Sequence, residues 1–404
     1  MLKKKNKLRI GIFSDTYFPY ISGVVTAIDS LKEALEKEGH EVFIITINAE
    51  DRFKYKKEGH VIRIPGIPTG IYDHSIRITY PVKAIKMVKD LKLDIIHAHT
   101  EFGIGLFGKS MAKKLQIPFV QTFHTLYEDA VKYVTKGLFP RLSNRVVIKA
   151  IKLYYSEFID QIIVPSDKVK SILTDKYKIK PEINTIPNGV KIEQFYKEKY
   201  KEKNIDKIRE ELNINKDDFV ILWVGRLGYE KNIAFLVNNH KKIMEINPTA
   251  KLLIVGGGPE EENLKQLAIK NGIANNVIFT GKVKYEDIGI YYQLGSVLSS
   301  ASTFETQGLT LIEALAASLP LVCIKDESFT SIIEENYNGF IFKNKNEYIK
   351  AMTHLINNKT LLKEMSYNAR ESSNEYLLST FAKKVLNVYT KAINNYNNKK
   401  NITK

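Results

Sequence analysis

The chain has 404 residues, 44% of them hydrophobic and 26% charged, which is a globular composition long enough for two domains of about 200 residues each. No apolar run reaches the ~18–20 residues that span a bilayer. A single cysteine, Cys323, excludes an internal disulfide, and together with a basic start that lacks a signal-peptide core it predicts a cytoplasmic protein. Residues 1–200 hold +12 of the net charge of +16 (34 Lys and Arg against 22 Asp and Glu), which predicts a negatively charged partner: nucleic acid, an anionic membrane or an acidic metabolite.

Short apolar runs alternate with amphipathic segments along the whole chain. In the first half the predicted strands are Leu8–Phe13, Val42–Ile47, Ile95–His97, Phe119–Thr122 and Gln161–Val164. After residue 216 they are Val220–Val224, Leu252–Val255, Val277–Phe279, Val297–Ser299 and Leu321–Ile324. The helices predicted between them include Val24–Glu38, Ala234–Ile246, Glu260–Asn271 and Leu309–Ala317. Continuous apolar strands that alternate with helices predict an α/β protein with parallel sheets covered on both faces.

The alternation restarts after the charged stretch Lys197–Lys216. We therefore predict two Rossmann-like, doubly wound domains, residues 1–195 and 196–376. The last helix, 377–396, has no strand after it, and we expect it to pack back on the N-terminal domain.

Two features of the first half resemble ligand sites. Gly103, Gly105 and Gly108 match the dinucleotide fingerprint, but they begin several residues past their strand, so close helix packing is the better interpretation. His97 and His99 place two imidazoles on one side of a strand; no third ligand is evident, and we predict no metal site.

The second half has a phosphate-type junction. Arg226 and Lys231 follow the strand Val220–Val224 directly and precede the next helix, where helix N–H groups point outward. A guanidinium fork and a mobile ammonium both suit phosphate oxygens; the alternative is two ordinary surface cations. The glycine-rich turn 255–259 is a second, weaker junction of this kind.

Two glutamates flank the predicted start of a later helix. Glu305 lies in the turn before Gly308, and Glu313 lies on the helix about one turn further in. Backbone N–H groups there suit an anion, and the two carboxylates suit a polyhydroxylated ligand. The alternative is that Glu305 only favours the helix macrodipole and that Glu313 lies on a solvated helix face.

Together these motifs resemble the family 4 retaining glycosyltransferases of the GT-B fold. The likeness rests on Gly225-Arg226 with Lys231, and on Glu305 and Glu313 at E-x7-E spacing. Further segments match in the right order: 15–19, 22–24, 94–99, 164–166 and 186–190. It covers nearly the whole chain and implies two Rossmann-like domains with a cleft between them.

The resemblance also implies a role for individual residues. Arg226 and Lys231 would hold the diphosphate of a nucleotide sugar and neutralise it as it leaves. Glu313 would bind the ribose, Glu305 would face the donor sugar, and His124 would approach that sugar from the acceptor side as a hydrogen-bond donor. The other implied donor contacts are Gln307, Gly308, Leu309 and Thr310, Lys282 and Val283 beside the base, and Gly23 at the phosphate.

The implied chemistry is metal-independent transfer with retention of configuration and no cofactor. No Asp-x-Asp pair occurs in the chain, so cations and helix N-termini would stabilise the leaving diphosphate. The leaving phosphate itself would help to remove the acceptor proton, and no classical general base is assigned.

The block 305–310 and the segment 123–129 resemble bacterial diacylglycerol glucosyltransferases. This implies transfer of glucose from UDP-glucose to diacylglycerol, in glycolipid synthesis on the inner face of the cell membrane. UDP-galactose and GDP-mannose stay open as donors, because Thr306 stands where many family members have phenylalanine.

A basic segment supports a peripheral membrane location independently. Residues 130–156 hold six cations and no acid: Lys132, Lys136, Arg141, Arg145, Lys149 and Lys152. The last four fall within about 80° of one another on a helical wheel, beside apolar residues. This pattern is typical of a helix on an anionic surface; the alternative is a partly buried helix with a solvated face.

Three other functions remain open. The acceptor could be soluble or a polyprenyl-linked sugar in polymer assembly, or the protein could be a sugar-nucleotide epimerase. A nucleic-acid-binding module would explain the charge, but the basic stripe lacks a recognisable motif with interleaved aromatics, so we expect no nucleic-acid partner.

Overall fold

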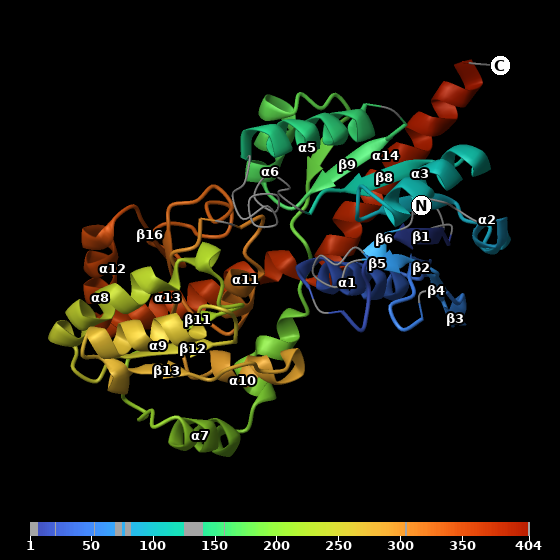
Figure 1. Cartoon of the computed structure of the whole chain (residues 1–404). Helices are drawn as coiled ribbons and strands as arrows, with labels where there is room; N and C mark the ends of the chain where they lie inside the picture. Colours follow the sequence, from blue (N-terminus) through green and yellow to red (C-terminus); the bar gives the residue numbers. More distant parts are fainter. Residues whose placement is uncertain are drawn as a thin grey trace, which may run out of the picture. The chain divides into compact units, whose positions relative to one another are not determined.

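The computed structural model describes residues 7–20, 22–51, 53–68, 75–76, 82–124, 140–156, 158–303 and 305–402. The chain forms two compact units (Figure 1): unit 1 is Met1–Gly189 with Leu378–Lys404, and unit 2 is Val190–Leu377. The boundary lies slightly before the predicted position between residues 195 and 196. Its physical reason is that Ile192 and Phe195 are fully buried in the core of unit 2.

Unit 1 is built on an eight-stranded sheet in the order β10-β9-β8-β7-β1-β2-β4-β3. Its strands are β1 (Arg9–Phe13), β2 (Glu41–Ile47), β3 (Lys56–Glu58), β4 (Val61–Ile64), β7 (Ile95–Ala98), β8 (Phe119–Thr122), β9 (Gln161–Val164) and β10 (Ile183–Thr185). All pairs are parallel except β3 with β4. A separate antiparallel pair is formed by β5 (Ile67–Pro68) and β6 (Ser75–Ile76). The five strands predicted for this half are all present. The strands β3, β4 and β10 were missed because none of them is a continuous apolar run.

Helices cover both faces of this sheet. They are α1 (Gly23–Lys37), α2 (Val82–Asp90), α3 (Ile104–Leu115), α5 (Pro140–Tyr155), α6 (Asp167–Ser171), the π-helix η1 (Ile172–Lys176) and α14 (Leu378–Ile402). Ile12 of β1 belongs to the core under α1 and α14, whereas Phe13 belongs to the core under α2, α3 and α5. The predicted last helix, 377–396, lies in α14, which packs on α1 through Ala34, Leu378 and Ala382.

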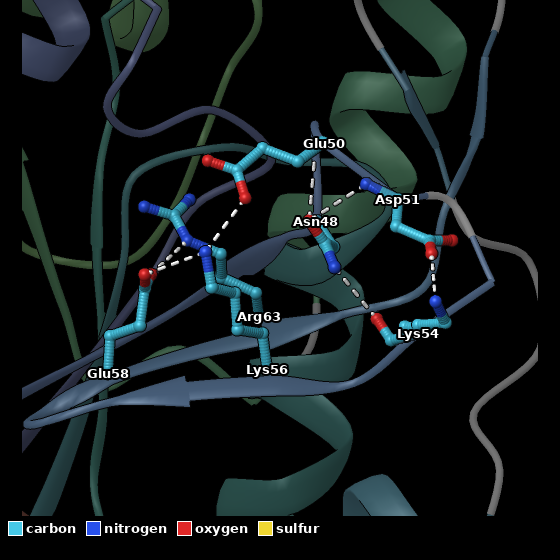
Figure 2. Close-up of polar contacts among 7 residues, drawn as sticks. All are labelled: Asn48, Glu50, Asp51, Lys54, Lys56, Glu58 and Arg63. Carbon is cyan, nitrogen blue, oxygen red and sulfur yellow. Dashed lines mark hydrogen bonds and ion pairs between the residues drawn. The ribbon is translucent and has the colours of Figure 1, made fainter.

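Charged side chains close the β3 edge of this sheet (Figure 2). Arg63 of β4 is only 8% exposed, and its Nε donates to Glu58 at 2.8 Å. Lys56 pairs with Glu50 and Glu58, both at 2.8 Å. The side-chain oxygen of Asn48 accepts two backbone N–H groups of the turn that follows β2. Charges on an edge strand oppose edge-to-edge pairing with another chain, so we assign this cluster a structural role.

Unit 2 contains a six-stranded parallel sheet in the order β13-β12-β11-β14-β15-β16. The strands are β11 (Val220–Val224), β12 (Lys251–Val255), β13 (Val277–Phe279), β14 (Val297–Ser300), β15 (Leu321–Ile324) and β16 (Gly339–Phe342). Counted from its first strand, the order is 3-2-1-4-5-6, that of a Rossmann fold. Unit 1 has the same arrangement around β1 and β7. Strand order therefore reverses between β11 and β14, and between β1 and β7, where such sheets bind ligands.

Helices also cover both faces of the second sheet. They are α7 (Glu202–Glu211), α8 (Ile233–Ile246), α9 (Glu261–Lys270), α10 (Ile288–Tyr292), α11 (Leu309–Ala316), α12 (Lys345–Asn357) and α13 (Lys359–Ser372). Short 3-10 turns lie at η2 (Ile192–Phe195), η3 (Lys197–Lys199), η4 (Tyr229–Lys231), η5 (Ala274–Asn276), η6 (Tyr285–Asp287) and η7 (Ser373–Tyr376). The predicted helices agree with these bounds to within one residue at each end, and Cys323 is buried as a small apolar side chain.

Candidate functional site

Three loops meet at the carboxyl ends of β11, β12 and β13 in unit 2. The N–H of Gly225 donates to the carbonyl of Val255 at 3.0 Å, and the N–H of Gly256 donates to Gly281 at 3.2 Å. Gly256 has φ +129°, and a Cβ there would lie 1.9 Å from the carbonyl oxygen of Gly225. Only glycine permits this approach. The glycine-rich turn 255–259 is therefore what lets these loops touch.

Lys282 and Val283 lie beside this junction. A Cβ on Gly257 would lie 2.8 Å from Cγ of Lys282, so the lysine stem covers the turn after β12. Val283 is partly buried against the core of unit 2. Both residues predicted at the nucleotide base therefore lie at the same sheet edge as Arg226.

Arg226 and Lys231 each have a carboxylate partner. Nζ of Lys231 lies 2.6 Å from Oε1 of Glu305, and Nη2 of Arg226 lies 2.5 Å from Oε1 of Glu230. Lys231 and Glu305 come from opposite sides of the point where strand order reverses. The fold therefore brings together two of the predicted residues that are 74 positions apart. Glu230, which the sequence analysis did not single out, balances the guanidinium charge.

The loop after β14 leads into α11 through Gly308. This glycine has φ +83°, and no side chain caps the helix. A Cβ at Gly308 would also meet the ring of Phe329 at 2.9 Å. The first turn of α11, with Leu309 and Thr310, therefore leaves backbone N–H groups without a capping side chain, and Gln307 is buried just before it.

Glu313 is buried on α11 and is held by two tyrosines. Tyr292 Oη donates to Oε2 at 2.6 Å, and Tyr285 Oη donates to Oε1 at 3.4 Å. Burial raises the pKa of Glu313 to about 7, although both hydrogen bonds act to lower it. Burial, together with the Glu313 charge and hydrogen bond, raises the pKa of Tyr292 well above its usual value. The expected alternative of a solvated face is therefore wrong.

Sequence reasoning missed the two tyrosines. They are seven residues apart, the spacing that places side chains on one face of a helix, and they precede β14. Among the 22 tyrosines of the chain this spacing was not distinctive.

In unit 1, the carboxyl ends of β1 and β7 carry the corresponding junction. Gly23 is the first residue of α1, Ser22 caps that helix, and a Cβ on Gly23 would meet nothing within 4 Å. Asp15 accepts the N–H of Ile104 at 2.7 Å, at the start of α3. Burial raises the pKa of Asp15 to about 7, against the lowering effect of that hydrogen bond.

The glycine fingerprint in α3 serves helix packing. A Cβ on Gly105 would lie 1.6 Å from the carbonyl oxygen of Thr100, and one on Gly108 would lie 2.9 Å from the ring of Phe13. Since Asp15 already occupies the helix start, this turn is not arranged for a phosphate. The interpretation as close helix packing agrees with the structure.

Three histidines gather where β7 and β8 end. His97 is hydrogen-bonded at both ring nitrogens, to Tyr389 Oη (2.8 Å) and Thr122 Oγ1 (2.6 Å). His99 Nδ1 lies 2.8 Å from His124 Nε2. Burial lowers the pKa of His97 to about 3, that of His99 well below its usual value, and that of His124 to about 4. Within the described ranges, no three His, Cys, Asp or Glu side chains are placed to share a metal ion.

The predicted membrane stripe is only partly described. Lys132 and Lys136 lie outside the described residues, and Arg141 and Arg145 lie on the first turns of α5. Lys149 and Lys152 are exposed, next to Leu153, which is 72% exposed.

The same helix is anchored in the core. Its residues Ile151 and Tyr155 are fully buried in the core of unit 1. Tyr155 is thus a core residue. No helix in the described part of the chain is long and apolar enough to cross a membrane.

Comparison with known proteins places the chain in a family. The family profile described as Glycosyltransferase Family 4 matches residues 21–194, and the one described as Glycosyl transferases group 1 matches residues 204–372. The alpha-monoglucosyldiacylglycerol synthase of Acholeplasma laidlawii is 36% identical over 98% of this chain and 100% of its own length. The enzyme of the same name from Streptococcus pneumoniae is 34% identical over 98% of this chain and 89% of its own.

Solved structures show the same fold. Anabaena HepE in complex with UDP superimposes with a TM-score of 0.73 at 16% identity, covering 94% of this chain and 99% of its own. Its complex with UDP-glucose has a TM-score of 0.71 over the same shares. The fold of the two units, the family profiles that match each of them and the full-length relatives all indicate the same family. The chain is a glycosyltransferase that belongs to family 4 and has the GT-B fold.

Proposed function

We propose that this glycosyltransferase moves glucose from UDP-glucose to the free hydroxyl of diacylglycerol, with retention of the anomeric configuration. The observation that carries the proposal is identity of 36% and 34%, along nearly the whole chain, to two alpha-monoglucosyldiacylglycerol synthases. Glycosyltransfer to a lipid is thereby favoured over epimerisation and over nucleic-acid binding.

The donor would lie along the carboxyl ends of the unit 2 strands. Arg226, Lys231 and the uncapped start of α11 supply positive potential for a diphosphate. Glu313 supplies carboxylate oxygens for the ribose hydroxyls, while Lys282 and Val283 border the base. The solved complexes of Anabaena HepE with UDP and UDP-glucose support a donor of this kind.

The chemical step would break the bond between the anomeric carbon and the β-phosphate oxygen. A bond from the acceptor oxygen forms on the same face of the sugar, and the acceptor proton passes to the leaving phosphate oxygen. Arg226 and Lys231 neutralise the charge that develops on the diphosphate, so we assign this task to side chains and not to a metal ion. Glu305 and His124 hold the sugar and are not a proton-transfer pair.

Diphosphate binding would also change the partner of Glu305. In the structure this carboxylate is the counter-ion of Lys231, at 2.6 Å. A bound diphosphate takes over that ammonium, and Glu305 then turns to the donor sugar.

The acceptor side would be a lipid surface on the inner face of the cell membrane. Helices α2, α3 and α5 cover one face of the unit 1 sheet through a common core. They expose lysines at positions 83, 86, 89, 113, 114, 149 and 152, next to the exposed apolar side chains Val82 and Leu153. At about 1 kcal/mol per cation near anionic lipid, several of these suffice for reversible docking.

The test combines a donor panel with vesicles. Purified protein is given UDP-glucose, UDP-galactose or GDP-mannose together with diacylglycerol in neutral or anionic vesicles, and the product linkage is read by NMR. We expect an α-glucosyl product from UDP-glucose and higher turnover on anionic vesicles. Lys149→Glu with Lys152→Glu should weaken co-sedimentation, whereas Lys270→Glu with Lys363→Glu, exposed positions of unit 2, makes the same charge change and should not.

Two results would overturn parts of this proposal. Equal binding to neutral and anionic vesicles at moderate salt would remove the electrostatic docking. Turnover with a soluble or polyprenyl-linked sugar, but not with diacylglycerol, would replace the acceptor by the alternative class.

A further inference from the structure

The bond between His99 and His124 leaves one ring nitrogen in the protein core without a partner. His99 is 3% exposed and its Nδ1 is bonded to His124, but its Nε2 has no hydrogen-bond partner among the described residues. The neighbouring His97 has both nitrogens bonded, so it cannot supply the missing contact without giving up one of its own. The unpaired Nε2 of His99 restricts where the protons of His99 and His124 can lie.

The geometry shows that the two imidazoles share one in-plane hydrogen bond. Their planes differ by only 20°, their centroids lie 5.1 Å apart, and the two nitrogens lie 2.8 Å apart. A centroid separation this large requires both nitrogens to lie on the line between the ring centres. One ring therefore donates an N–H along this line, and the other accepts it with its lone pair.

Only two proton arrangements are possible for a neutral pair. If His124 donated from Nε2, the single proton of His99 would lie on Nε2, where a buried N–H would have no acceptor. If His99 donates from Nδ1, its Nε2 carries only a lone pair, and an unmet acceptor is the better tolerated of the two. The second arrangement places the proton of His124 on Nδ1.

We infer that His99 is a positioning residue that holds His124 in its Nδ1–H tautomer, so that this ring presents a permanent hydrogen-bond donor to a hydroxyl of the donor sugar. His124 is partly exposed, and its Nδ1 has no partner within the described part of the chain. The role of the donated bond rests on the proposed function, whereas the tautomer does not.

The surroundings keep this arrangement rigid. His97 lies against His99 with ring centroids 4.3 Å apart and is tied to Thr122 of β8 and Tyr389 of α14. The C-terminal helix therefore anchors a histidine row that ends at His124. A neutral donor suits a neutral sugar hydroxyl, since the hydrogen bond forms without burying a charge.

The tautomer can be read directly in protein labelled with ¹⁵N-histidine, because long-range ¹H–¹⁵N spectra distinguish the two neutral forms. We expect His124 to be Nδ1–H in the wild type and to shift toward Nε2–H in His99→Leu. We also expect His99→Leu to lower kcat/KM for the donor about tenfold, the effect of one hydrogen bond. In His99→Asn an amide nitrogen takes the place of Nδ1 on Cγ, so this variant should restore most of the rate.

Two controls separate positioning from structural damage. His354→Leu, an exposed position on α12, should change neither the His124 signals nor the rate. His99→Leu should have no further effect on kcat/KM in a His124→Ala background. An Nε2–H tautomer of His124 in the wild type would overturn the inference, as would an unchanged tautomer in His99→Leu. If the wild type fails to glucosylate diacylglycerol, the spectra still decide the tautomer.

Discussion

Replacing Glu313 by glutamine should remove a pH-dependent loss of stability in unit 2 while it damages the donor site. The pKa of Glu313 is raised by burial from 4.5 to about 7. The folded state therefore holds this proton more tightly than the unfolded chain, and the stability so gained is fully present below pH 4.5 and lost as pH rises to about 7. The difference corresponds to about 3 kcal/mol of unfolding free energy. Because glutamine does not titrate, the variant does not lose this stability as the pH rises.

The assay is urea unfolding of wild type and Glu313→Gln at pH 4.5 and pH 8, followed by the fluorescence of Trp223. This is the single tryptophan of the chain, and it is buried in β11, so it reports on unit 2. At each pH, the unfolding free energy of the wild type is subtracted from that of the variant. This difference should be up to about 3 kcal/mol larger at pH 8 than at pH 4.5. All other titrating groups are shared and cancel.

Two further measurements complete this test. Glu364→Gln, an exposed carboxylate on α13, should show the same difference from wild type at both pH values. UDP should bind Glu313→Gln about tenfold to a hundredfold more weakly at pH 8, because a hydrogen bond from ribose to a charged carboxylate is lost. A stability difference for Glu313→Gln that does not grow with pH would refute the reasoning.

Three other substitutions test the site and its surroundings. Glu305→Gln should slow glucosyl transfer at least about a hundredfold, yet bind UDP about two- to fivefold more tightly by calorimetry, because Lys231 loses its competing partner; unchanged turnover would remove Glu305 from the site. Gly23→Ala should leave the thermal midpoint unchanged, since its Cβ meets nothing within 4 Å, but weaken donor binding if the phosphate lies there. Gly105→Ala should instead destabilise unit 1 by about 1–3 kcal/mol in calorimetry, since its Cβ would overlap the carbonyl of Thr100; equal midpoints for the two glycine variants would contradict this.

Much of the fold was readable from local patterns. Strands such as Val220–Val224 are continuous apolar runs, and a strand buried on both faces needs that pattern wherever it lies. The start of α11 followed because Gly308 marks a helix start by its own backbone properties. The edge strand β3 and its neighbour β4 were missed, because their residues are charged or mixed and acquire strand structure only by pairing.

The candidate site likewise contains residues that could be predicted from the sequence and contacts that could not. Arg226, Lys231, Glu305 and Glu313 could be selected from the sequence, because position at the carboxyl end of a strand or the start of a helix gives those residue types a physical purpose. Their partners could not. That Lys231 meets Glu305, and that Tyr292 holds Glu313, depends on strand order, which brings distant loops to one sheet edge.

The histidines illustrate this limit most clearly. The alternation of side chains along a strand by itself placed His97 and His99 on one side of the predicted strand. Only the tertiary structure decided that His97 is tied to α14 while His99 faces His124 with one nitrogen unpaired. Hydrophobic periodicity and turn preferences depend on a few neighbouring residues, so they can be predicted from the sequence. Which buried polar atoms find partners is settled only when elements far apart in the chain are packed together.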